Sequence, residues 1–344
     1  MKPEIKPDKN KESGSDSNAT TTIKNSIISS DDLLEKHKNF KLEFLWQDFI
    51  VKNGNNFLTA EGGTGKSRLA LSLAFCIQYG YNEFLGCLLN TDGNVLYLNY
   101  EITEPMFKVL IEPINKYYKA TDLPKVKELF IVTFKGKIKF TIEDVEELIA
   151  DNNIKFIIID SFKACASKLY REKNTKFDNL NADLYFDILD SWREKYKITT
   201  LTINHTNKGL KNQKTSGDLA FGPSAVRDFM DYQFFLRYAT DNKAPERLLI
   251  LDKTRFTANG DHDKLIRITD DYTGGLYYKL LESGINEDDF INKKPPHEKT
   301  DEITDLLNEG KKYDEIVELT GVSRQTISRV QEYRKSLNKI KRNY

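Results

Sequence analysis

A glycine-rich loop followed by a lysine and a serine is the segment of this sequence best suited to bind phosphate. The segment NNFLTAEGGTGKSRLALSLAFCI, residues 55–77, combines an apolar strand, the loop and an amphipathic helix. Glycines leave the backbone N–H groups open to phosphate oxygens, and the start of the helix adds positive partial charge. Lys66 is expected to neutralise the β- and γ-phosphates of ATP, and the Ser67 hydroxyl to bind Mg²⁺. The residues predicted to hold the nucleotide are Glu61, Gly62, Gly63, Thr64, Gly65, Lys66, Ser67 and Arg68.

The loop departs from the pattern G-x-x-x-x-G-K-[ST] only at its first position, where Ala60 replaces glycine. A glycine-rich turn before an ordinary helix is the alternative interpretation. The order of strand, loop, Lys-Ser and helix favours the nucleotide site.

Two acidic residues stand at the ends of other apolar runs. Asp160 closes the run KFIIID, where a carboxylate can hold Mg²⁺ through water, and Glu101 follows VLYLNY. Because parallel strands present their carboxyl ends at one edge of a sheet, both carboxylates are expected near the loop. Glu101 is the candidate general base that polarises the attacking water. The alternatives are an Asp that caps a turn and a solvated Glu that opens a loop.

Polar and basic residues on two later segments are further candidates. His205 ends the run ITTLTINH and is a candidate sensor of the γ-phosphate, with Asn204, Thr206 and Lys208 as alternative contacts. Lys253 and Arg255 lie two apart in LDKTR, so an extended strand places them on one face. Such cations can stabilise phosphoryl transfer in a neighbouring subunit. A structural histidine and a solvated strand edge are the alternatives.

The elements around these residues indicate an α/β domain with a mostly parallel sheet. Apolar runs alternate with amphipathic stretches, and runs without helices between them follow Phe229, which predicts an antiparallel extension. The predicted strands are Asn56–Thr59, Val95–Asn99, Phe130–Phe134, Lys155–Asp160 and Thr199–Asn204, then Tyr232–Arg237, Arg247–Leu251, Leu265–Thr269 and Leu276–Leu280. The predicted domains are a disordered tail at 1–30, an ATPase domain at 31–290, a Pro-Pro linker at 291–298 and a C-terminal domain at 299–344.

The C-terminal segment has the pattern of a helix-turn-helix. Gly321 supplies the tight turn, and Ser323 is a good N-cap for a last helix that is rich in Lys and Arg. That helix is expected to enter the major groove of duplex DNA, with support from the basic residues 335–342. Its predicted contacts are Ser323, Arg324, Gln325, Thr326 and Arg329. A small helical bundle for protein contacts is the alternative.

Composition limits the remaining classes. The 52 basic and 52 acidic residues cancel, so net charge indicates no partner. The three scattered cysteines form no C-x-x-C pair, which argues against a disulfide framework or a zinc site. The apolar runs are too short to span a membrane. The expectation is a soluble, cytoplasmic protein.

Taken in order, AEGGTGKS, VLYLNYE, FIIIDS, TINHTNK, the stretch from Ser216 to Arg237 and LDKTRF resemble the RecA-like P-loop ATPases. The pattern is most similar to the RepA-type plasmid and phage replicative helicases, related to the DnaB family, over about two thirds of the chain. The resemblance implies that Glu101 is the catalytic glutamate, that His205 belongs to a histidine motif after its strand, and that Lys253 and Arg255 reach a neighbour's nucleotide. It also implies a homo-oligomeric ring, usually a hexamer, with single-stranded DNA in its channel.

The resemblance is incomplete where related proteins carry a DNA-contacting loop, because this sequence reads Phe221-Gly-Pro-Ser224 there. The C-terminal segment resembles the helix-turn-helix of resolvases and transposases. The expected function is therefore an ATP-dependent DNA motor in plasmid, phage or mobile-element replication. The alternatives are an ATPase of recombination or transposition that does not unwind DNA, and a nucleotide-controlled DNA-binding regulator.

Overall fold

The computed structural model describes residues 27–120, 123–135, 141–171, 179–206, 214–222, 225–239, 246–256, 265–269, 278–290 and 298–342. The chain divides into two compact units, Met1–Leu42 and Glu43–Tyr344. In the first unit, helix α2 (Ser30–Lys36) begins at the N-cap Ser29, whose side chain accepts a hydrogen bond from the Asp32 N–H group. This helix buries none of its residues.

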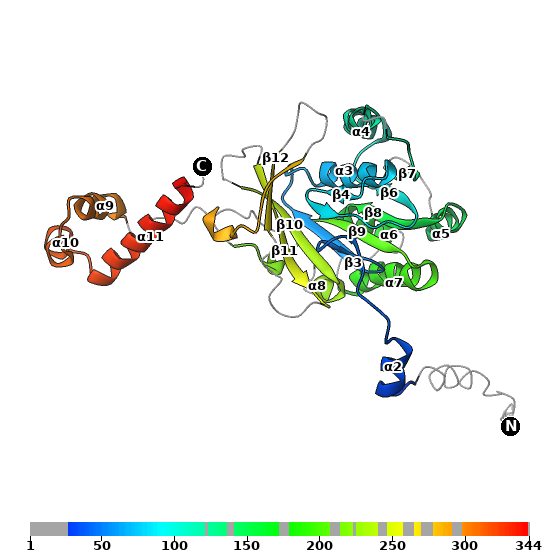
Figure 1. Cartoon of the computed structure of the whole chain (residues 1–344), viewed down its shortest axis with the longest axis horizontal. Coiled ribbons are helices and arrows are strands. Elements are labelled where there is room, and N and C mark those ends of the chain that lie inside the picture. Colours follow the sequence, from blue (N-terminus) through cyan, green and yellow to red (C-terminus); the bar gives the residue numbers. More distant parts are fainter. Residues whose placement is uncertain are drawn as a thin grey trace, which may run out of the picture. The chain divides into compact units, whose positions relative to one another are not determined.

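The second unit contains a nine-stranded sheet in the order β13-β12-β11-β10-β3-β9-β8-β6-β7 (Figure 1). The strands are β3 (Asn55–Ala60), β6 (Asn94–Asn99), β7 (Leu129–Thr133), β8 (Ile154–Asp160), β9 (Thr199–His205), β10 (Tyr232–Tyr238), β11 (Glu246–Thr254), β12 (Leu265–Thr269) and β13 (Lys279–Ser283). The sheet is parallel from β7 to β10 and antiparallel from β10 to β13. This confirms the α/β fold with an antiparallel extension. The last strand begins at Lys279, later than the predicted Leu276–Leu280, and residues 270–277 lie outside the described part.

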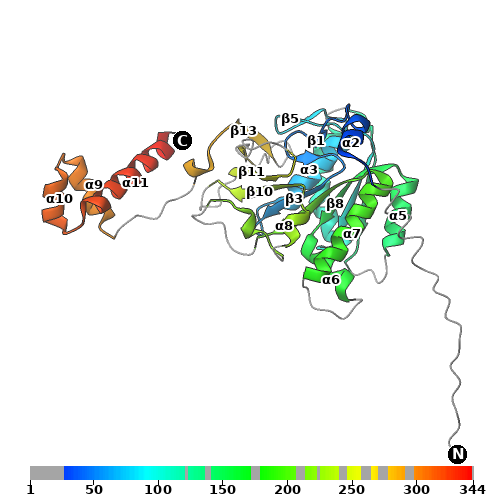
Figure 2. The same cartoon turned by 90° about the horizontal axis from the view of Figure 1, so that it is seen from below.

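Helices cover both faces of the parallel part of the sheet (Figure 2). Helices α3 (Lys66–Gln78) and α4 (Glu104–Lys119) pack together, and α3 lies against β3 and β6. Helix α7 (Asn179–Tyr196) contacts both α5 (Ile142–Asp151) and α6 (Phe162–Arg171), and the short α8 (Ala225–Phe229) packs on α7. Helices α5 and α6 lie against β8, and α6 also lies against β9. The sheet is therefore buried between two helical layers, as parallel sheets require.

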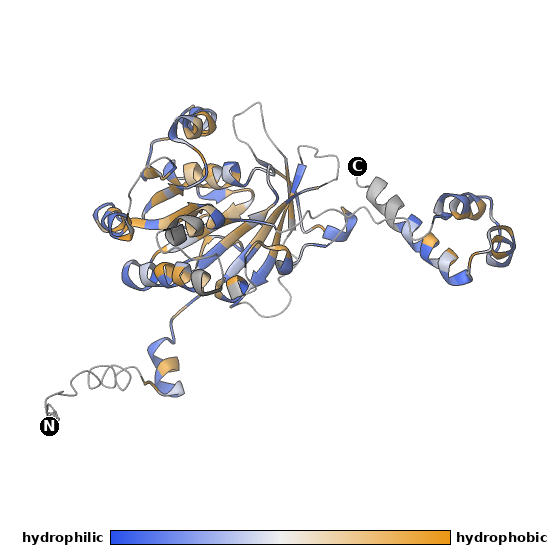
Figure 3. Cartoon of the chain, turned by 180° about the vertical axis from the view of Figure 1, so that it is seen from behind, coloured by the Kyte–Doolittle hydropathy of each residue, from blue (hydrophilic) through white to orange (hydrophobic). Residues whose placement is uncertain are grey.

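The burial of the strands explains their composition. All six residues of β3 are buried, and the run Phe156–Asp160 of β8 is buried as well. Figure 3 shows the hydrophobic residues concentrated on the strands and on the helix faces turned towards them. Two short hairpins were not predicted: β1 (Phe44–Trp46) pairs with β2 (Ile50–Val51), and β4 (Glu83–Phe84) pairs with β5 (Cys87–Leu88).

Three helices form the C-terminal part of the described chain: α9 (Thr300–Asn308), α10 (Tyr313–Thr320) and α11 (Arg324–Arg342). They enclose their own apolar cluster, which consists of Ile303, Ile316, Val322, Ile327 and Val330. Gly321 ends α10 with φ at 71°, a left-handed conformation that glycine adopts without strain. Among all described residues, no helix is both long and apolar enough to cross a membrane.

Candidate nucleotide site

The glycine-rich loop connects the end of β3 to the start of α3. Gly63 and Gly65 have φ angles of 78° and 100°, which only glycine adopts readily. The Lys66 side chain folds back over the loop, and its Nζ donates to the carbonyl oxygens of Ala60 at 3.1 Å and Glu61 at 2.8 Å. Burial lowers the pKa of Lys66, while the nearby carboxylates of Glu101, Asp160 and Glu61 act in the opposite direction. The loop thus holds a buried cation where the phosphates of a nucleotide are expected.

Three side chains of the antiparallel extension hold this loop from outside, and sequence reasoning did not identify them. The Tyr238 hydroxyl donates to the Gly63 carbonyl at 2.9 Å. The Arg247 Nε donates to the Thr64 carbonyl at 2.9 Å, and the Tyr278 hydroxyl donates to the Gly65 carbonyl at 2.9 Å. Arg247 and Tyr278 are buried.

Asp160 lies at the carboxyl end of β8, beside the loop. Its Oδ2 accepts a hydrogen bond from the Tyr97 hydroxyl at 2.7 Å, whereas its buried Oδ1 has no hydrogen-bond partner among the described residues. Burial raises the pKa of Asp160, and the neighbouring Ser67 and Tyr97 hydroxyls oppose that effect. An unsatisfied buried carboxylate oxygen next to a serine hydroxyl fits the oxygen ligands that Mg²⁺ prefers. Asp160 and Ser67 are therefore the residues that would hold the ion.

Glu101 follows β6 and points towards the same edge of the sheet. The buried Asn99 fixes the turn, because its side chain accepts hydrogen bonds from the N–H groups of Glu101 at 3.2 Å and Ile102 at 3.1 Å. The Glu101 Oε1 accepts hydrogen bonds from the Ser161 hydroxyl at 2.5 Å and from His205. These contacts lower the pKa of Glu101 to about 2, with the His205 hydrogen bond as the largest cause. Glu101 is thus an ionised carboxylate held in one orientation.

His205 joins the two charged groups of the site. Its Nδ1 lies 3.4 Å from Lys66 Nζ, and its Nε2 lies 3.0 Å from Glu101 Oε1. An ammonium group can only donate, so Nδ1 is the acceptor and Nε2 carries the proton that it donates to the carboxylate. The imidazole therefore links Lys66 to Glu101 through a chain of hydrogen bonds.

The alternative contacts on this strand have other partners. Asn204 is buried, and its side chain donates to the Phe221 carbonyl at 2.9 Å. Thr206 forms a β-bridge with Ala220, while Lys208 lies outside the described residues.

Within the phosphate loop, the Thr64 hydroxyl donates to the Glu61 carbonyl at 2.5 Å.

The structure does not bring Lys253 and Arg255 to the loop of their own chain. Lys253 pairs with Gln233, and Gln233 pairs with Phe57, three residues before the end of β3. At roughly 3.3 Å per residue, Lys253 lies about 10 Å back along the sheet from the loop, and Arg255 lies farther. Burial and the neighbouring arginines lower the pKa of Lys253.

The buried Asp231 positions Arg255. Its Oδ1 lies 3.3 Å from the Arg255 guanidinium, and its Oδ2 accepts a hydrogen bond from the Asn55 N–H group at 2.9 Å. Arg193 pairs with the same Oδ2 at 3.2 Å. Arg255 keeps 44% of its side chain exposed, so its charge stays available at the surface.

The predicted DNA contacts lie at the start of α11. Ser323 accepts a hydrogen bond from the Thr326 N–H group at 3.2 Å, as an N-cap does. Ser323, Arg324, Gln325 and Arg329 are exposed, and Thr326 is half-buried. The Arg324 guanidinium forms an ion pair with the exposed Asp314 of α10. The side chains of residues 336–342 lie outside the described part.

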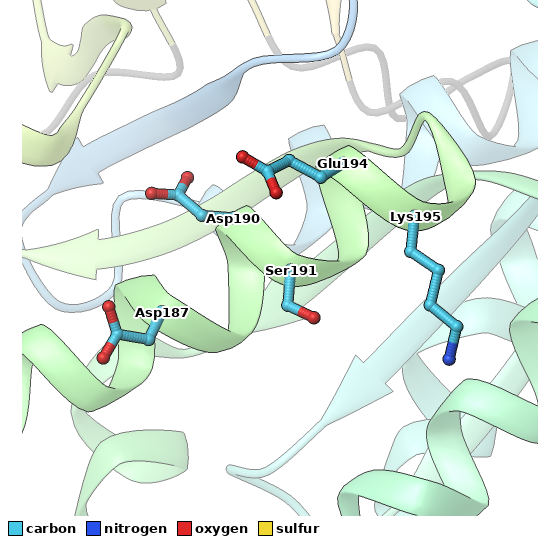
Figure 4. Close-up of a pocket in the computed structure, with 5 residues that line it drawn as sticks. All are labelled: Asp187, Asp190, Ser191, Glu194 and Lys195. Atoms are coloured by element: carbon cyan, nitrogen blue, oxygen red, sulfur yellow. The ribbon is translucent and has the colours of Figure 1, made fainter. Parts of the chain in front are cut away.

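A shallow hollow runs along α7 (Figure 4). It is lined by Asp187, Asp190, Ser191, Glu194 and Lys195. The Asp190 Oδ1 accepts a hydrogen bond from the Asn55 side chain at 2.9 Å, at the first residue of β3. The hollow is therefore at the opposite end of β3 from the phosphate loop and is separate from the nucleotide site.

Comparison with protein families agrees with this geometry. A family model described as AAA domain matches residues 27–210, just over half of the chain and the part that carries the loop, Glu101, Asp160 and His205. Among solved structures, the chain is similar to a KaiC-like protein from the hyperthermophilic archaeon Pyrococcus horikoshii OT3. The two share 15% identity with a TM-score of 0.46, and the match covers 69% of this chain and 94% of that chain. No curated protein matches the sequence.

Proposed function

The chain belongs to the AAA domain family of nucleotide-hydrolysing ATPases, and from this premise we propose that it is an ATP-driven motor acting on DNA as a ring of identical subunits. Each subunit would bind ATP on its own phosphate loop. A neighbouring subunit would complete that site.

The position of Lys253 and Arg255 is the observation that carries the proposal. Both cations lie towards the end of the sheet away from their own loop, and Asp231 fixes the exposed guanidinium of Arg255. A cation pair that cannot reach its own nucleotide can still reach one bound to an adjacent copy. This arrangement supports ATP hydrolysis at the interface between subunits, and head-to-tail contacts form a closed ring where the rotation between subunits closes.

The chemistry of hydrolysis is assigned to residues of the site. Lys66 and the loop N–H groups bind the phosphates, and the ionised Glu101 orients and polarises the attacking water. Bound Mg²⁺ would neutralise charge on the phosphate oxygens. His205 connects Glu101 to Lys66, so it is placed to report on the γ-phosphate.

The C-terminal helices would bring the motor to duplex DNA. The exposed Arg324, Gln325 and Arg329 begin a helix that packs on its own small core, as a recognition helix does. The sequence Phe221-Gly-Pro-Ser224, at the position of a DNA-contacting loop in the resembling helicases, favours a second candidate: an ATPase that regulates DNA transactions without unwinding.

Subunit mixing tests the ring directly. Lys66→Ala and Arg255→Ala should each abolish ATP turnover when pure. When the two are mixed in equal amounts, about one quarter of the interfaces pair an intact loop with an intact arginine, so about one quarter of wild-type activity should return. Turnover should also rise with single-stranded DNA, and light scattering should detect an ATP-dependent oligomer. An inactive mixture with a monomeric mass would refute the ring, and DNA-stimulated turnover without separation of a forked duplex would favour the second candidate.

A further inference from the structure

We infer that Arg247, Tyr278 and Tyr238 are positioning residues that set the phosphate-binding peptides of the loop before nucleotide arrives. The inference concerns nucleotide binding alone and does not depend on a ring or on DNA. All three side chains belong to the antiparallel extension of the sheet, far from the loop in sequence.

The peptide geometry explains how an outside contact controls the inside of the loop. In a trans peptide unit, the C=O group of one residue and the N–H group of the next point in opposite directions. The bound carbonyls belong to Gly63, Thr64 and Gly65, so their partners are the N–H groups of Thr64, Gly65 and Lys66. Holding these carbonyls outward therefore turns the N–H groups of Gly65 and Lys66 inward, where phosphate oxygens are expected. The N–H group of Thr64 donates to the Glu61 carbonyl at 3.5 Å, within the loop.

The loop needs such support because glycine restricts rotation about its backbone bonds less than any other residue does. Glycine loses more conformational freedom on ordering than any other residue, so a loop with three glycines has a large entropic cost of adopting one shape. Contacts that exist before binding reduce the part of this cost that nucleotide must overcome.

The three donors are themselves fixed. Arg247 and Tyr238 are directly paired across β10 and β11, and the Arg247 guanidinium lies 4.5 Å from the centre of the Tyr238 ring. Tyr278 is 2% exposed, and its hydroxyl lies only 1.9 Å from the position that a Cβ on Gly65 would occupy. The tyrosine thus packs directly on the glycine. Arg247 also brings a buried positive charge to the outer side of the loop, where it favours a bound polyphosphate.

Removal of one hydroxyl tests the inference. In Tyr278→Phe the affinity for a fluorescent ATP analogue and for ADP, measured with Mg²⁺ and without DNA, should fall about tenfold, the value of one lost hydrogen bond. The matched control is Tyr118→Phe. Tyr118 is also buried, and its hydroxyl donates to a backbone carbonyl of α3, that of Ser72, at 3.2 Å, but outside the loop.

The comparison separates positioning from general stability. Both variants should unfold at similar temperatures without nucleotide, and only Tyr278→Phe should lose affinity. Tyr238→Phe, on a more exposed ring, should show the same loss and covers the case in which the first variant does not fold. Unchanged affinity in Tyr278→Phe and Tyr238→Phe, or an equal loss in Tyr118→Phe, would overturn the inference. Failure of subunit mixing to restore activity would leave this result unaffected, because the assay measures binding by single chains.

Discussion

Replacing Glu101 with glutamine should slow ATP hydrolysis about 100-fold while leaving ATP affinity within about threefold of wild type. Glutamine keeps the oxygen that accepts from Ser161 and His205 but puts an amide where the second carboxylate oxygen stood, so it cannot take a proton. General bases contribute roughly 10²- to 10⁴-fold, and the most effective ones have a pKa near the working pH. The pKa of Glu101 is about 2, so its contribution should be at the low end of that range, or about 2.7 kcal/mol in the barrier.

Single-turnover hydrolysis with excess enzyme measures this step without product release, and titration of a fluorescent nucleotide measures binding in the same sample. Ser161→Ala is the control, because it removes one hydrogen bond to the same oxygen and keeps the carboxylate. Its Glu101 should have a higher pKa and be a slightly stronger base, so hydrolysis should stay within about tenfold of wild type. If Glu101→Gln hydrolyses ATP within fivefold of wild type, or loses binding and hydrolysis equally, then Glu101 is not the base.

Three further substitutions test other parts of the structure. His205→Ala removes the main cause of the low pKa of Glu101. The stability that this low pKa gives the folded chain is complete above about pH 4.5 and is lost as the pH falls towards 2. Acid unfolding, followed by circular dichroism, should therefore begin at higher pH in the variant, and an unchanged midpoint would contradict this. Gly65→Ala places a Cβ on a residue with φ at 100°, where it would collide with the hydroxyl of Tyr278. The resulting strain of about 1–3 kcal/mol should lower nucleotide affinity more than tenfold, which titration calorimetry can measure. Asp314→Ala removes the ion-pair partner of Arg324 and one negative charge. Affinity for duplex DNA, measured by gel shift at low salt, should therefore rise roughly two- to fivefold. Weaker binding would argue that the ion pair orients the arginine for DNA.

The sequence was sufficient to predict that Lys66, Glu101 and Asp160 lie close together, because each of them follows a local pattern. Lys66 belongs to a loop with fixed spacing, while Asp160 and Glu101 close apolar runs whose ends converge in a parallel sheet. The alternation of apolar runs and amphipathic stretches likewise predicted a parallel sheet covered by helices. The ends of the strands were harder to predict, as β13 illustrates, because a largely exposed strand lacks a clear alternation of burial.

The supporting residues could not be predicted because no local pattern links them to the loop. Arg247 and Tyr278 are separated from their carbonyl partners by 183 and 213 residues. A single arginine or tyrosine in a strand gives the same sequence pattern whether its side chain contacts solvent or a distant backbone group. The role of Asp231 could not be predicted for the same reason, because its ion-pair partner Arg255 follows a different strand, β11. Such roles depend on tertiary packing, which the order of residues alone does not reveal.

The close approach of Gly65 and Tyr278 also constrains how this protein can change over time. Any other residue at position 65 would collide with the tyrosine hydroxyl, and loss of the tyrosine would remove a contact to the loop. A substitution at one of these positions therefore requires a compensating change at the other, so Tyr278 should be inherited together with the loop. Among descendants of the same ancestor, replacement of the tyrosine should coincide with other substitutions around the loop, and a domain that exchanged its last strands with a distant relative should lose nucleotide binding.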